Sequence, residues 1–385
     1  MIHVTSAFDS GAITVLDAVD PADIRLAIRP DAAADFSQWF HFRVSGVRDT
    51  ELRLCLANAA KSTYPGGWQG YRAVASYDRE NWFRVDTRYD GTNLVITHRS
   101  AADHIWFAYF EPYTLERHFG LLARAQLQPT LRVRTLGYSC AGRPIDVVEA
   151  GLQDPGAPQA WIICRQHPGE SMAEWFAEGL LERLGDGADP IVTQLLRAAR
   201  LHIVPNMNPD GTVLGNLRTN ARGIDLNRAW REPSPETSPE VFVVREAILA
   251  SGAAVFLDVH GDEALPYVFI DSSETHPYYT SAHLEREQRF TRILQELSPD
   301  FQTVHGYPAT PYRPELLAMA SQWVASRFED LSFTVEMPFK DNANLPDEQV
   351  GWSGARSKRL GAAVVGVLHR TLVPAQPPVP NSGAC

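Results

Sequence analysis

The chain has 385 residues, which is long enough for roughly two or three domains. Its composition, with 44% hydrophobic and 21% charged residues, is typical of a globular protein, and it contains no apolar run of about 18 residues that would predict a membrane-spanning helix. The formal net charge of -11 argues against non-specific binding to nucleic acid.

The N-terminus and the cysteines bear on the cellular compartment. Residues 1–15 lack a basic stretch followed by an apolar one, so we expect no signal peptide. The cysteines show no paired spacing, and we therefore expect neither a disulfide framework nor a zinc site built from cysteine pairs. Both features favour a cytoplasmic protein. Nothing in the sequence indicates an oligomeric state.

Residues 1–112 read as an all-β domain. Short segments of alternating hydrophobicity are separated by turn signals, and Asp90-Gly91 between two of them predicts a hairpin. The expected strands are 40–47, 51–59, 71–77, 82–88, 93–98 and 105–110. Strands of this length and spacing are typical of a β-sandwich. The tryptophans of this region are interpreted as core and rim residues rather than a ligand-binding surface.

From residue 113 to residue 372, strands and helices alternate. This pattern predicts an α/β domain with a mixed sheet and helices on both faces. The expected strands are 161–165, 201–205, 255–259 and 331–335. The expected helices are 114–124, 171–184, 191–200, 279–297, 314–328 and 353–372. Residues 373–385 are rich in Pro, Gly and Ser and are expected to form a flexible tail.

Two strand ends carry residues that suit a metal ion. His167-Pro168-Gly169-Glu170 follows the strand 161–165, and His260 follows the strand 255–259. Ligands of α/β sheets gather at the carboxyl ends of strands, and catalytic zinc commonly takes two imidazoles and one carboxylate. Each segment alone has an ordinary alternative, a polar surface loop or a core histidine. Together they favour a zinc site.

Two further segments carry charged residues that suit catalysis. Arginines including Arg218 and Arg228 cluster between the two metal segments, where guanidinium groups suit a carboxylate or an oxyanion. The alternative is a solvated basic loop or a structural ion-pair network. Glu336 ends the apolar strand 331–335, where a carboxylate fits the general base for an activated water. The alternative is an exposed glutamate at a strand end.

The chain resembles the zinc metallocarboxypeptidases, and within them the cytosolic carboxypeptidase subgroup and its bacterial relatives. Five motifs occur in the family's order across about residues 114–372: His167-Pro168-Gly169-Glu170, Asn208-Pro209-Asp210-Gly211, Asp225-Leu226-Asn227-Arg228, His260-Gly261 and Thr334-Val335-Glu336. An N-terminal β domain is also similar to one that precedes the catalytic domain in this subgroup.

This resemblance implies a catalytic centre with one Zn²⁺ per chain. Its ligands are His167, Glu170 and His260, and Glu336 is the general base and later the proton donor. The reaction implied is hydrolysis of the C-terminal residue of a peptide or protein. No nucleic acid or membrane partner is implied.

The same resemblance assigns the residues between the metal segments. Arg218 corresponds to the arginine that stabilises the tetrahedral oxyanion. Asn227 and Arg228 correspond to the pair that holds the substrate's terminal carboxylate. Asp225 corresponds to a carboxylate that orients the first zinc histidine.

Some points stay open at this stage. The family's mobile tyrosine corresponds to Tyr307 or Tyr312, and no motif decides between them. Eukaryotic members trim glutamate, and Arg222 and Arg231 are candidates for recognising such a side chain. The main alternative function is a zinc amidohydrolase similar to aspartoacylase and succinylglutamate desuccinylase, which acts on small N-acyl amino acids. A peptidoglycan peptidase and a binding protein without catalysis are further alternatives.

Overall fold

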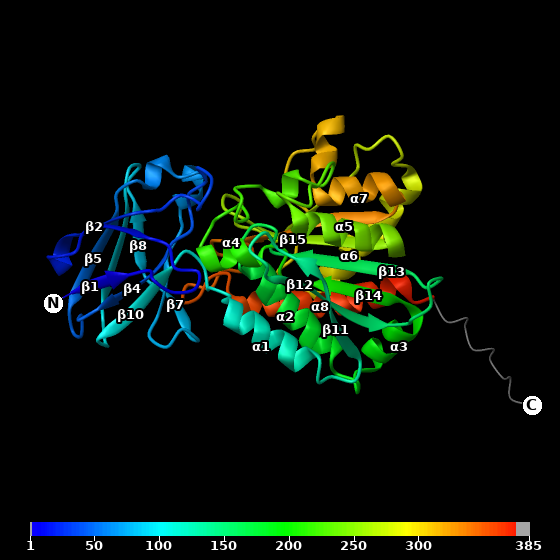
Figure 1. Ribbon diagram of the computed structural model, residues 1–385, viewed down its shortest axis with the longest axis horizontal. Helices are drawn as coiled ribbons and strands as arrows, with labels where there is room; N and C mark the ends of the chain where they lie inside the picture. Colours follow the sequence, from blue (N-terminus) through cyan, green and yellow to red (C-terminus); the bar gives the residue numbers. More distant parts are fainter. Residues whose placement is uncertain (1, 375–385) are drawn as a thin grey trace, which may run out of the picture.

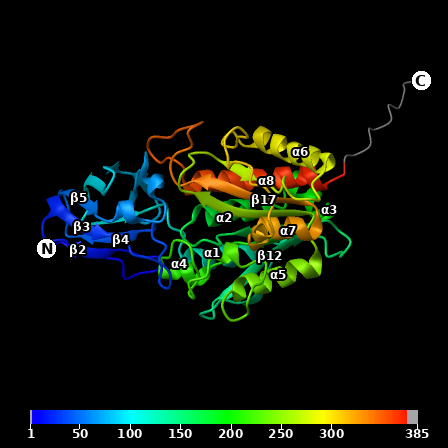
Figure 2. The ribbon, with the colours of Figure 1, turned by 90° about the horizontal axis from the view of Figure 1, so that it is seen from above.

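The computed structural model describes residues 2–374, and a β-rich N-terminal part lies beside an α/β part (Figures 1 and 2). This order agrees with the fold expected from the sequence. The tail expected at 373–385 falls outside the described residues from position 375 onward. No helix of the described residues is both long and apolar enough to cross a membrane.

The N-terminal part consists of two five-stranded sheets. The first has the order β1 (His3–Thr5), β4 (His41–Ser45), β10 (His104–Ala108), β6 (Val74–Ser76) and β7 (Trp82–Arg84). The second has the order β2 (Thr14–Asp17), β3 (Ile24–Ala27), β5 (Glu51–Leu56), β9 (Leu94–Arg99) and β8 (Asp86–Tyr89). Side chains of both sheets, such as Phe42 and Phe107 from one and Leu54 and Ile96 from the other, fill a common core.

The expected hairpin is present, and the first three strands were not foreseen. Strands β8 and β9 pair antiparallel, and the Asp90 carboxylate accepts from the backbone of Thr92 and Asn93. Strands β1–β3 have only three or four residues, and every residue of β2 is exposed. Strands of three or four residues offer too few positions for an alternating pattern to be read from sequence.

The α/β part is built on a seven-stranded mixed sheet. Its order is β11 (Leu131–Tyr138), β12 (Pro144–Gly151), β14 (Arg200–Val204), β13 (Gln159–Cys164), β15 (Val255–Asp262), β17 (Leu331–Pro338) and β16 (Phe269–Asp271). The central strands β14, β13, β15 and β17 are parallel, and the remaining pairs are antiparallel. The carboxyl ends of the parallel strands therefore meet at one edge.

Helices cover both faces of this sheet (Figure 2). The helices of this part are α1 (Leu115–Ala125), α2 (Met172–Leu184), α3 (Pro190–Ala198), α4 (Pro209–Leu214), α5 (Pro239–Ser251), α6 (Ser281–Leu297), α7 (Ala320–Phe328) and α8 (Gly354–Leu372), of which the short α4 lies beside the N-terminal part. Successive strand residues point to opposite faces. Ile162 belongs to the core shared with α2 and α8, whereas Trp161 and Ile163 belong to the core shared with α5 and α7.

Three helical segments differ from the expectation. The motif Asn208-Pro209-Asp210-Gly211, where no helix was expected, begins α4, and the Asn208 side chain accepts from the Gly211 amide. Helix α5 was not foreseen. The helix expected over 314–328 is divided into a 3-10 turn at Pro314–Ala318 and α7, which begins after Met319.

Candidate metal centre

The candidate residues lie at the carboxyl ends of three neighbouring parallel strands. His167 and Glu170 stand in the loop after β13. His260 on β15 is the direct register partner of Glu336 on β17. Strand pairing thus brings together residues from three separate segments of the chain.

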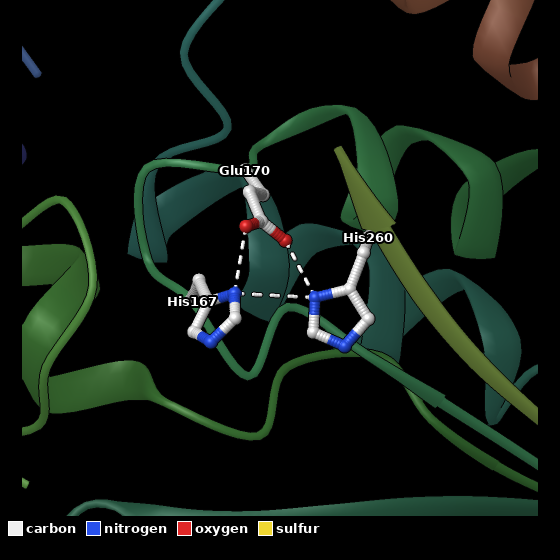
Figure 3. Close-up of side chains that lie close together, drawn as sticks. All are labelled: His167, Glu170 and His260. Atoms are coloured by element: carbon white, nitrogen blue, oxygen red, sulfur yellow. Dashed lines mark hydrogen bonds and ion pairs between the residues drawn. The ribbon is translucent and has the colours of Figure 1, made fainter. Parts of the chain in front are cut away.

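The side chains of His167, Glu170 and His260 converge on one point (Figure 3). The two oxygens of Glu170 each lie 2.7 Å from an Nδ1 atom, one of His167 and one of His260. The two Nδ1 atoms are 3.2 Å apart. All three residues are buried, and one ligand atom from each lies within 4.8 Å of the others.

A carboxylate contacts the Nε2 atom of each histidine, on the side away from this point. Asp225 Oδ1 lies 3.1 Å from His167 Nε2, and Asp258 Oδ1 lies 2.9 Å from His260 Nε2. Each carboxylate favours a proton on Nε2 and leaves the Nδ1 lone pair free for a cation. Sequence reasoning missed Asp258. Its only signal is an acidic residue within an apolar strand, two positions before His260 and so on the same face.

The donor set fits zinc. Two imidazole nitrogens and one carboxylate oxygen make up a common catalytic zinc site with room for a water. Burial acts to raise the pKa of Glu170, but His167 and His260 outweigh it and hold that pKa well below its usual range. Glu170 is therefore ionised and available as a ligand.

Glu336 stands beside this point as a buried carboxyl group. Its Oε1 lies 3.3 Å from the Tyr307 hydroxyl, and its Oε2 is buried with no hydrogen-bond partner among the described residues. Burial raises the pKa of Glu336 well above its usual value; His260 opposes this, and Glu170 adds to it. A buried oxygen without a partner is costly unless a ligand or water satisfies it.

Two of the three guanidinium nitrogens of Arg218 are held by hydrogen bonds. Its Nε donates to Asp225 Oδ2 at 2.7 Å, and its Nη1 donates to the Tyr64 hydroxyl at 2.6 Å. Its Nη2 makes no hydrogen bond within the described chain. Burial acts to lower the pKa of Arg218, but Asp225 outweighs it and keeps the guanidinium charged.

Asn227 and Arg228 follow on the same loop. The Asn227 amide oxygen accepts from the backbone of Ala320, and its nitrogen lies 3.3 Å from His260 Nε2. Arg228 Nη1 donates to the Asn227 carbonyl at 2.8 Å. Arg228 is exposed, and it lines the cavity described next.

A cavity of about 460 Å³ contains these groups. It is lined by the three metal candidates together with Arg218, Asn227, Arg228 and Glu336, while Asp225 lies behind the wall. Of the two candidate tyrosines, Tyr307 lines the cavity and donates to Asp262 Oδ2 at 2.6 Å. Tyr312 instead packs against His276, with ring centroids 4.6 Å apart. Neither Arg222 nor Arg231 lines the cavity.

Comparison with known proteins accounts for both parts of the chain. A family described as the cytosolic carboxypeptidase N-terminal domain matches residues 4–110, and the family of zinc carboxypeptidases matches residues 121–352. The chain belongs to the zinc carboxypeptidase family. This confirms the resemblance read from the five motifs, and the aspartoacylase-type alternative is not favoured.

Solved structures of metallocarboxypeptidases are similar over nearly the whole chain. The metallo-carboxypeptidase from Burkholderia cenocepacia is 48% identical, with a TM-score of 0.95 over 96% of this chain and 99% of that one. The metallo-carboxypeptidase from Pseudomonas aeruginosa in complex with (2-guanidinoethylmercapto)succinic acid is also 48% identical, with a TM-score of 0.92 over 96% and 98%. The protein is therefore a metallocarboxypeptidase.

Eukaryotic relatives are more distant. Human cytosolic carboxypeptidase 6 is 27% identical over 326 residues, which cover 77% of this chain and 63% of that relative. The chain thus spans less than two thirds of the length of this relative.

Proposed function

We propose that the enzyme removes the C-terminal residue of peptides or proteins, using one Zn²⁺ held by His167, Glu170 and His260. The convergence of these three buried side chains beside the unsatisfied carboxylate of Glu336 carries the proposal. Zinc held there would supply a water with a lowered pKa and would polarise the scissile carbonyl.

Glu336 acts as the general base and then as the general acid. Its partnerless Oε2 accepts the proton of the attacking water and delivers it to the leaving amine nitrogen. Its buried, acidic surroundings raise the affinity of this carboxylate for a proton, which suits both steps.

Two arginines are placed to bind the two negative charges of the reacting substrate, the developing oxyanion and the terminal carboxylate. Nη2 of Arg218, which has no hydrogen-bond partner among residues 2–374, is available to the oxyanion that develops on the scissile carbonyl. Arg228 and Asn227 bind the terminal carboxylate and so restrict cleavage to the chain end. Tyr307, whose hydroxyl lies near Glu336, is our candidate for the tyrosine that covers the bound residue.

The remaining charges of the cavity bear on the side chain that is removed. Apart from the metal and base candidates, three carboxylates line it as negative charges, Asp262, Asp271 and Glu274, because burial raises the pKa of a fourth, Glu263, well above its usual value. The positive residues of the lining are the already assigned Arg218 and Arg228. Such a lining repels glutamate and favours a cationic or neutral side chain. The compound bound to the Pseudomonas aeruginosa relative carries a guanidino group and two carboxylates.

A peptide library with varied C-terminal residues tests the proposal, with Glu336→Gln as the control variant. We expect single-residue trimming by the wild type and a fall in kcat of about 10² to 10⁴-fold in the variant. Zinc content of the variant should be unchanged. Hydrolysis confined to N-acyl amino acids would instead support the amidohydrolase alternative.

A further inference from the structure

The loop that carries Arg218 is held by the N-terminal domain. The carboxylate of Asp31 accepts from three successive backbone amides, Leu217 at 2.5 Å, Arg218 at 3.0 Å and Thr219 at 2.8 Å. It also accepts from the Thr219 hydroxyl at 2.8 Å. Asp31 is only 6% exposed, so these four hydrogen bonds form in a site largely shielded from water.

The Arg218 side chain meets the same domain. Tyr64, directly before the 3-10 turn Pro65–Trp68, accepts a 2.6 Å hydrogen bond from Arg218 Nη1 and lines the catalytic cavity. The ring of Phe36 lies 5.7 Å from the guanidinium carbon. With Asp225 on Nε, the guanidinium is fixed from two domains at once.

Other residues near Arg218 also accept hydrogen bonds from the N-terminal domain. Ser10 donates its amide to Val213 O at 3.2 Å, and Ala32 donates to Asn216 Oδ1 at 2.9 Å. Gly215, at the end of α4, has φ +66°, and a Cβ there would lie 2.8 Å from Ser10 O. A residue without a side chain is therefore needed where the two domains meet, at α4 in Figure 1.

We infer that the N-terminal β domain is part of the active site, with Tyr64 and Asp31 as positioning residues for Arg218. The inference rests on the proposed role of Arg218 at the oxyanion. Asp31 fixes the backbone from which Arg218 extends, and Tyr64 together with Asp225 fixes the plane of its guanidinium. Nη2, the nitrogen without a protein partner, is then held toward the cavity.

Electrostatic stabilisation of a transition state depends on donors that are already oriented when charge develops. A free arginine side chain has several rotatable bonds. If they are already fixed in the folded enzyme, less conformational entropy is lost when the transition state forms. Loss of the Tyr64 hydroxyl should therefore weaken stabilisation of the transition state more than binding of the substrate. Such a loss lowers kcat and changes KM little.

Tyr64→Phe removes only the hydroxyl. We expect kcat to fall about tenfold with KM changed less than about twofold. Zinc content and the thermal unfolding midpoint should stay at wild-type values. Tyr77→Phe is the matched control: it removes a hydroxyl of the same domain that bonds His98 at 2.8 Å and the Ala101 amide at 2.9 Å, outside the cavity. It should leave kcat unchanged.

A double-mutant cycle with Arg218→Ala distinguishes action through Arg218 from direct contact with substrate. If Tyr64 positions Arg218, Tyr64→Phe should change kcat less than about twofold once Arg218 is absent. An equal effect of Tyr64→Phe in both backgrounds would overturn the inference. Asp31→Asn, compared in the same cycle, should show the same coupling.

The cycle also separates this inference from the proposed function. If Arg218→Ala leaves kcat at the wild-type value, the role proposed for Arg218 is wrong. If Arg218→Ala lowers kcat but Tyr64→Phe does not, that role stands and the positioning by the N-terminal domain is wrong.

Discussion

Each of the two candidate zinc histidines contacts one carboxylate, and these two carboxylates differ in the other residues that they contact. Asp225 contacts both His167 and Arg218, so it links the metal centre to the proposed oxyanion arginine. Asp258 contacts His260 and accepts from Gln166, and has no contact with Arg218. The roles of Asp225 and Asp258 can therefore be distinguished by substituting each of them separately.

We expect Asp225→Asn and Asp258→Asn each to lower zinc affinity by about 10 to 100-fold, because an amide supports a zinc-bound imidazole less well than a carboxylate. Competition with a chelator measures this. At saturating zinc, Asp225→Asn should retain a deficit in kcat because Arg218 has lost an anchor, whereas Asp258→Asn should recover most activity. Equal recovery by both variants would contradict the link through Asp225.

That the motif residues lie close together was predictable from sequence. Contacts made between distant parts of the fold were not. His167 and Glu170 are three positions apart, and the order of the other motifs pointed to His260. Tyr64 lies 154 positions from Arg218, its hydrogen-bond partner, and belongs to another domain. No local spacing records such a contact.

At the scale of elements, the strands that position the site were the most predictable. Strands β13, β15 and β17 are buried at every residue and mostly apolar, and the sequence showed them as largely hydrophobic segments. Helix α5 was missed although Ser238 precedes it and Pro239 begins it, because its apolar residues are spread around the helix rather than along one stripe. Helix α4 has only six residues, too few for a periodic pattern.

Glu111 joins the N-terminal part to helix α8. Its carboxylate accepts from the Gly354 amide at 3.0 Å, and burial raises its pKa from 4.5 to about 7. The folded protein thus binds a proton more tightly than the unfolded chain does. Stability from this group is complete below pH 4.5 and is lost as the pH rises to about 7.

We therefore expect Glu111→Gln to raise the free energy of unfolding at pH 8 by about 2 to 3 kcal/mol relative to the wild type, and to change it little at pH 4.5. Urea denaturation at the two pH values measures the difference. Glu116→Gln, on the exposed surface of α1, should change stability by less than about 0.5 kcal/mol at either pH. A pH-independent effect of Glu111→Gln would contradict this assignment.

At the scale of the whole molecule, the two parts pack through buried aromatic residues as well as through the Arg218 loop. Tyr109 stacks on Phe339 with ring centroids 4.5 Å apart, and Phe110 contacts the same ring edge-on. Phe339 directly follows β17, the strand that carries Glu336. The N-terminal domain therefore contacts the segments that present both the proposed base and the proposed oxyanion arginine.

The charge of the molecule and of its cavity have the same sign. The chain carries a formal net charge of -11, and Asp271, on the strand beside β17, lines the cavity near Glu274. Burial, followed by repulsion from Glu274 and Glu287, raises the pKa of Asp271 to about 6. At neutral pH this carboxylate is ionised and attracts a cationic side chain, and below about pH 6 it becomes neutral.

We expect kcat/KM for peptides ending in Lys to exceed that for matched peptides ending in Glu by about tenfold at pH 8 and low salt, and the difference to narrow as salt screens the field. The ratio of Lys to Leu substrates should fall as the pH is lowered from 8 to 5. Asp271→Asn should lower that ratio at pH 8 and remove most of its pH dependence, because the ionising group is then absent. A preference for Glu over Lys in the wild type would contradict the prediction and would indicate that the substrate side chain contacts Arg218 or Arg228 rather than the acidic wall.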